Sequence, residues 1–114
     1  MQFNIHTITD KDIIVIDAPK RLTSDISDDL KSIMKEYVDR EKYNIIINLE
    51  ETEFIDSSGL GAIVSKISIT RSNNGDIKLA APQRYVVDLL EVTHLNKVIE
   101  ILDSVEEAIE GFEK

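Results

Sequence analysis

The chain contains no cysteine, and its two histidines, His6 and His94, stand far apart in the sequence. The absence of cysteine excludes disulfide bonds, thiol catalysis and cysteine-ligated zinc, and two separated histidines do not form the cluster that a histidine-rich metal site requires. No apolar run approaches the roughly 20 residues that a membrane-spanning helix needs. The N-terminus also lacks the basic segment and apolar core of an export signal. We therefore expect a cytoplasmic protein that holds no metal or cofactor and does not bind a membrane.

Positive charge is scarce as well, because 13 basic residues face 22 acidic ones and the formal net charge is −9. Such a chain repels nucleic acid and gains little from counterion release on binding it. The nearest basic groups, Lys20-Arg21 and Arg40 with Lys42, are pairs rather than runs and are typical of solvated surface. We therefore expect no direct contact with nucleic acid.

The chain is 42% hydrophobic and 31% charged, a composition typical of a globular protein, and its 114 residues fit one domain spanning 1–114. Apolar runs predict strands, and apolar residues at helical spacing predict helices. Strands are expected near 3–8, 13–16, 44–49, 77–80 and 98–102, and helices near 26–38, 57–71, 82–93 and 105–112. This alternation predicts an α/β fold with a mostly parallel mixed sheet of about five strands and four to five helices.

The most informative segment is Asp56-Ser57-Ser58-Gly59-Leu60-Gly61, which follows a predicted strand and opens a predicted helix. Free backbone N–H groups and the positive end of the helix dipole favour added negative charge at this point. A serine at this point, Ser57 or Ser58, is therefore a candidate phosphorylation site. An equally plain interpretation is that Asp-Ser-Ser caps the helix and needs no modification, and both roles can share one residue.

The helix predicted at 57–71 has one strongly apolar face and one nearly neutral face. Lys66 is the only charged residue between Ser57 and Thr70, whereas ordinary solvent-exposed faces are charged. The apolar face comprises Leu60, Ile63, Val64 and Ile67, and the neutral face comprises Ser58, Gly61, Ala62, Ser65, Ser68 and Ile69. We interpret the neutral face as a docking surface. The alternative is that another helix of the same domain covers it, with Gly61 serving only close packing.

The segment from Leu49 to Lys66, LEETEFIDSSGLGAIVSK, resembles the STAS domain, specifically the stand-alone anti-sigma factor antagonists of bacteria. The resemblance implies a regulator without enzymatic activity. Its unphosphorylated form would bind an anti-sigma factor that is also a serine kinase, and a sigma factor would be released. The resemblance implies that phosphorylation falls on the residue after the aspartate, here Ser57, with Ser58 as second choice. Phosphorylation would reverse binding, and a metal-dependent serine phosphatase would restore it. ATP and Mg²⁺ would belong to the kinase.

Together, the neutral face and the resemblance define the expected site. The partner-binding residues are predicted to be Asp56, Ser58, Gly59, Gly61, Ala62, Ser65 and Ile69. One departure from the family pattern is that Lys20-Arg21-Leu22-Thr23 stands where Gly-x-Leu-Asp is usual. If the neighbouring strands are parallel, this loop opens at the same end of the sheet as Ser57, so that Lys20 or Arg21 would lie near an added phosphate. We expect a monomer or a weak dimer.

The sequence leaves one alternative function open and argues against two others. A STAS module could control a different target, such as a cyclase or a kinase cascade. An enzyme could use Ser57 as a nucleophile with Asp56 and one histidine, but the leading glycine of the Gly-x-Ser-x-Gly elbow is missing. A small-ligand sensor could use the carboxyl edge of the sheet, yet no glycine-rich loop that would cradle a phosphate is present.

Overall fold

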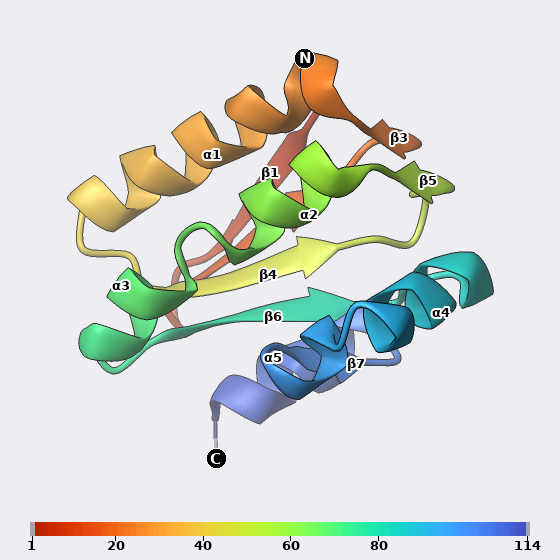
Figure 1. The fold of residues 1–114 in the computed structure, drawn as a ribbon. Helices are drawn as coiled ribbons and strands as arrows, with labels where there is room; N and C mark the ends of the chain where they lie inside the picture. Colours follow the sequence, from red (N-terminus) through yellow and green to blue (C-terminus); the bar gives the residue numbers. More distant parts are fainter. Residues whose placement is uncertain (1, 114) are drawn as a thin grey trace.

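The computed structural model describes residues 2–113, in which five strands form one sheet in the order β1-β2-β4-β6-β7 (Figure 1). β1 runs antiparallel to β2, and the remaining neighbours are parallel. The strands are β1 (Asn4–Ile8), β2 (Ile13–Asp17), β4 (Asn44–Asn48), β6 (Asp76–Ala80) and β7 (Glu100–Leu102). The helices are α1 (Ser24–Asp39), α2 (Ser57–Val64), α3 (Ile67–Ser72), α4 (Arg84–Val92) and α5 (Val105–Phe112), with a 3₁₀ turn at Leu95–Lys97. The predicted mixed, mostly parallel sheet of five strands is confirmed.

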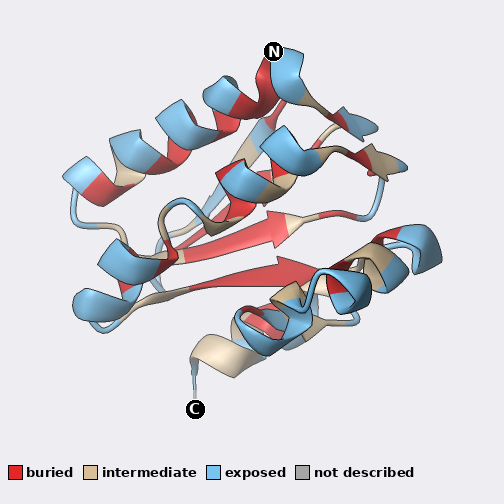
Figure 2. Ribbon diagram, viewed as in Figure 1, coloured by how far each residue is buried: buried red, intermediate tan, exposed pale blue. Residues whose placement is uncertain are grey.

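The central strands are apolar at successive positions because helices cover both faces of the sheet. Neighbouring residues on β4 point to opposite faces: Ile45 packs with Ile63 of α2 in the core beneath α1–α4, whereas Ile46 packs with Ala108 of α5. Figure 2 shows β4 and β6 as almost continuously buried between these layers. None of the helices within residues 2–113 is long and apolar enough to cross a membrane.

The predicted single helix at 57–71 is wrong in one respect, because the chain breaks between α2 and α3. The Ser65 hydroxyl donates to the carbonyl of Ala62 at 2.7 Å, and Lys66 leaves the helical region with φ −114° and ψ 10°. A serine hydroxyl that bonds a carbonyl one turn earlier competes with the regular helix ladder, so it can accompany such a break. α3 therefore starts as a separate short helix after a two-residue turn.

A second, very small sheet was not predicted. β3 (Arg21–Leu22) pairs in parallel with β5 (Phe54–Ile55), and the N–H of Asp56 continues the pairing by donating to the carbonyl of Leu22 at 3.2 Å. Two residues per strand are too few to produce a detectable alternation. This ladder brings the loop before α1 beside the loop before α2, so the two helices begin next to each other (Figure 1).

Candidate functional site

The Asp56 carboxylate joins the beginnings of α1 and α2. Its Oδ1 accepts the N–H of Gly59 at 2.9 Å and its Oδ2 accepts the N–H of Ser24 at 3.0 Å. The expected cap on α2 is confirmed, and the bond to α1 is an addition that the sequence did not indicate. Thr23, which occupies the N-cap of α1, makes no capping bond because its hydroxyl donates to the Asp25 carboxylate. Asp56 thus supplies the carboxylate that caps both helices.

Ser57 and Ser58 are the first two residues of α2, and both are exposed. Within residues 2–113 neither hydroxyl has a hydrogen-bond partner, so both are free to face solvent or a modifying enzyme. A phosphate on Ser57 would stand at a helix N-terminus, where negative charge is favourable. The geometry suits either serine as an acceptor, and the preference for Ser57 stays a prediction.

Two of the residues expected on the docking surface belong to the interior. Ala62 is fully buried, and Gly59 is buried against the loop before α1. A Cβ atom on Gly59 would lie 2.2 Å from the carbonyl oxygen of Leu22 and 2.8 Å from Cγ2 of Ile55. The surface position predicted for Gly59 and Ala62 is therefore wrong, because both allow α2 to pack closely against its neighbours.

The rest of the neutral face is open to solvent. Gly61 has no atom within 4 Å of the position where a Cβ would stand, and Ile69 is 44% exposed. The other exposed members are Ser58, Ser65 and Ser68. No other helix within residues 2–113 covers these positions, so the interpretation of Gly61 as a close-packing residue is wrong. We name the set Ser58, Gly61, Ser65, Ser68 and Ile69 the neutral surface.

An open groove lies between α1 and α3 at the end of the neutral surface that is remote from Ser57. Lys35 and Val38 line it from α1, and Ser65 and Ile69 line it from the opposite side. A hydrogen bond to Asp39, together with the charge of that carboxylate, raises the pKa of Lys35 above its usual value. The groove thus has one lysine already paired with an acid.

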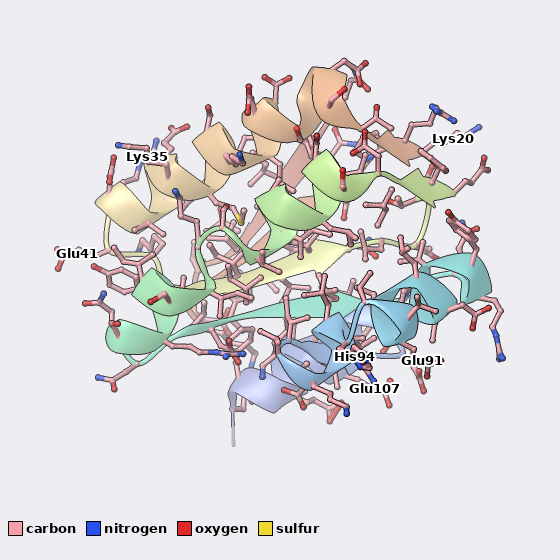
Figure 3. The ribbon with its side chains drawn as sticks, viewed as in Figure 1. Lys20, Lys35, Glu41, Glu91, His94 and Glu107 are labelled. Carbon is pink, nitrogen blue, oxygen red and sulfur yellow. The ribbon has the colours of Figure 1, made fainter. Side chains whose placement is uncertain are left out.

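Lys20 and Arg21 lie at the same edge of the fold as Ser57, as expected for parallel strands. Both are exposed, and Figure 3 shows Lys20 beside the two short strands, at the end of the molecule where α1 and α2 begin. The Arg21 guanidinium lies over the Phe54 ring, 4.8 Å from its centroid. Contact of either residue with a phosphate on Ser57 stays a prediction.

Neither histidine is hydrogen-bonded to Ser57. His6 pairs with Asp17 at 2.6 Å on the side of the sheet that α5 covers, and Figure 3 places His94 at the lower edge of the molecule, away from the start of α2. Among the described residues, Ser57 therefore has no histidine partner of the kind that activates a nucleophilic serine. Residues 2–113 also contain no group of three or more side chains arranged to bind a metal ion.

Comparison with known proteins finds relatives that are named anti-sigma factor antagonists. A candidate anti-sigma factor antagonist from Thermotoga neapolitana is 28% identical over 101 residues, which cover 88% of this chain and 89% of the relative. The anti-sigma F factor antagonist of Paenibacillus polymyxa is 25% identical over 105 residues, covering 91% and 90% of the two chains.

Solved structures show the same architecture. The crystal structure of a candidate anti-sigma factor antagonist from Thermotoga maritima matches with a TM-score of 0.88 and 25% identity, covering 98% of this chain and 95% of the other. The phosphorylated form of the Bacillus cell fate determinant SpoIIAA shares the fold with a TM-score of 0.74 and 21% identity, over 95% and 96% of the two chains. The family model of the STAS domain matches residues 4–108, and the chain therefore belongs to the STAS domain family.

Proposed function

We propose that this protein is an anti-sigma factor antagonist that works by partner switching in the cytoplasm. Its unphosphorylated form binds an anti-sigma factor that is also a serine kinase, and the sigma factor held by that partner is released. The observation that supports this proposal most directly is the Ser57 hydroxyl at the start of α2. It has no hydrogen-bond partner within residues 2–113 and lies next to the exposed neutral surface.

Phosphorylation of Ser57 switches binding off by electrostatics rather than by unfolding. A phosphate adds about two negative charges, and at a helix N-terminus these are favourable to the helix itself. The same charges would be buried beside a neutral interface when the partner docks, and an uncompensated charge in such a place costs several kcal/mol. Because about 1.4 kcal/mol changes an affinity tenfold, one phosphate is sufficient to release the partner.

The partner proteins catalyse both phosphorylation and dephosphorylation of Ser57. The kinase brings ATP and Mg²⁺, and a metal-dependent serine phosphatase removes the phosphate, so this chain is substrate and ligand rather than enzyme. Lys20 is exposed beside the loop before α1 and makes no ion pair within residues 2–113, which suits it to contact the phosphate on Ser57. Such a contact would slow dephosphorylation.

The proposal is tested with the purified chain and the purified anti-sigma factor kinases of the same organism. Incubation with the cognate kinase and MgATP is expected to add about 80 daltons, one phosphoryl group, to the wild type and to Ser58→Ala but not to Ser57→Ala. Titration calorimetry is expected to show that Ser57→Asp binds the kinase at least about 100-fold more weakly than the wild type. Equal binding of Ser57→Asp and wild type would contradict the switch.

A second candidate is a STAS module that controls a non-sigma target, such as a cyclase or a kinase cascade. The same neutral surface and the same serine would serve it equally well. Affinity purification with the unphosphorylated chain distinguishes the two: recovery of a kinase that itself holds a sigma factor supports the first function, and recovery of a different enzyme supports the second.

A further inference from the structure

Three side chains stack on the outer face of the β3–β5 ladder, outside the neutral surface. The Arg21 guanidinium lies 4.8 Å from the centroid of the Phe54 ring, and the Phe54 and Tyr85 rings lie 6.4 Å apart with an angle of 11° between their planes. Tyr85 comes from the first turn of α4 and is 50% exposed. Figure 1 shows β3, β5 and the start of α4 at the same end of the molecule. We name Arg21, Phe54 and Tyr85 the stacked patch.

The strands hold Arg21 in position but leave its donors free. Arg21 is aligned with Phe54 in the ladder, and the next pair, Leu22 and Ile55, is buried, so strand alternation directs Arg21 and Phe54 outward. The guanidinium carbon lies over the Phe54 ring, 4.8 Å from the ring centroid. Among residues 2–113, none accepts a hydrogen bond from Arg21 or forms an ion pair with it.

A guanidinium whose N–H groups are unpaired can bind a carboxylate through two parallel hydrogen bonds. Because the side chain is already stacked, less conformational entropy is lost when an acceptor arrives. Lys20, also unpaired within residues 2–113, adds a second positive charge beside the stack on a chain whose net charge is −9. The exposed acids Glu51 and Glu53 lie just before β5, so the recognition of an acidic group on another molecule depends on the unpaired donors of Arg21 rather than on the overall charge of the area.

The composition and position of the patch indicate a protein partner. Arginine and tyrosine are enriched among the residues that dominate the binding energy of protein interfaces. Phe54 precedes Ser57 by only three residues, a span of about 10 Å at most in extended chain. A protein that covers Ser57 would therefore lie close to Phe54, the central residue of the stacked patch.

We propose that the stacked patch is a second contact area for the same anti-sigma factor kinase, and that it takes a carboxylate of that kinase on Arg21 and a neighbouring apolar side chain on Tyr85. This inference rests on the proposed function. The patch strengthens binding of the unphosphorylated form, while Ser57 decides whether the complex forms.

The test measures binding of the purified kinase by titration calorimetry to unphosphorylated wild type and to single variants. Arg21→Ala and Tyr85→Ala are each expected to raise Kd at least about tenfold, and Arg21→Lys is also expected to raise it because lysine cannot form the paired hydrogen bonds. The matched control is Arg40→Ala, which removes an arginine that lies 5.2 Å from the Tyr37 ring centroid at the end of α1. Its Kd should stay within about twofold of the wild type.

Four outcomes would overturn the inference. If Arg21→Ala and Tyr85→Ala bind the kinase as tightly as the wild type, while Ser57→Asp still fails to bind it, the stacked patch is not a contact area. The proposed function is then unaffected. If Arg21→Ala only speeds dephosphorylation and leaves Kd unchanged, the guanidinium serves the phosphate on Ser57 instead. If Tyr85→Ala alters self-association in sedimentation but not Kd, a second copy occupies the patch. If no kinase binds the wild type, the proposed function fails and the inference falls with it.

Discussion

The substitution Asp56→Ala is expected to destabilise two helices at once. It removes the acceptor of the N–H of Gly59 in α2 and of the N–H of Ser24 in α1. Loss of a helix cap costs typically about 1 kcal/mol, and removal of a negative charge from a helix N-terminus costs about 0.3–1 kcal/mol, which partly overlaps with the capping value. For two helices the sum is about 2–3 kcal/mol, a substantial part of the about 5–15 kcal/mol that stabilises a typical domain.

Two assays measure how much stability Asp56→Ala loses. In urea, the free energy of unfolding should fall by about 2–3 kcal/mol, and at about 4 °C per kcal/mol for a chain of this length the Tm followed by circular dichroism should fall by about 8–12 °C. Asp56→Asn keeps one carbonyl oxygen and is expected to lose about half as much, because the amide group can accept at only one of the two helices. Ser104→Ala is the matched control, since Ser104 caps only α5 through the N–H of Glu107 at 3.1 Å.

The comparison with Ser104→Ala tests whether Asp56 stabilises both helices. Ser104→Ala removes one cap and is expected to cost about 1 kcal/mol. If Asp56→Ala costs no more than Ser104→Ala, or if Asp56→Asn is as stable as the wild type, the carboxylate does not stabilise both helices. The role of Asp56 would then be confined to α2.

Substitutions at three small residues give further predictions. Gly59→Ala is expected to lower the free energy of unfolding by about 1–3 kcal/mol, because the added methyl group meets a backbone carbonyl, whereas Gly61→Ala should raise it by about 0.5–1 kcal/mol since the position is open and helical. Urea denaturation measures both, and equal effects would contradict the packing described for α2. Ala81 has φ 56°, a left-handed conformation that is strained for alanine, so Ala81→Gly is expected to raise the melting temperature slightly, equivalent to at most about 1 kcal/mol. A lower melting temperature would argue that Ala81 is not strained.

Much of the site could be predicted from local features of the sequence. An apolar strand followed by Asp-Ser-Ser places Ser57 at a helix start, and the scarcity of charge between Ser57 and Thr70 indicates an exposed surface of unusual composition. The exposure of Gly61 and Ile69 agrees with that prediction. Helical spacing alone did not separate the buried Ala62 from its exposed neighbours, because alanine and glycine fit either environment.

The sequence by itself determined where the five strands of the main sheet lie along the chain and that a helix begins at Ser57. These features depend on the periodicity of apolar residues and on capping within a few residues. The tertiary structure alone decided that Asp56 also bonds Ser24, 32 residues earlier, and that Arg21, Phe54 and Tyr85 form one stack. These contacts join segments that are distant in the chain. The first contact depends on how the two-residue strands align α1 with α2, and the second depends on where α4 places Tyr85. No pattern within a single segment of the sequence predicts either contact.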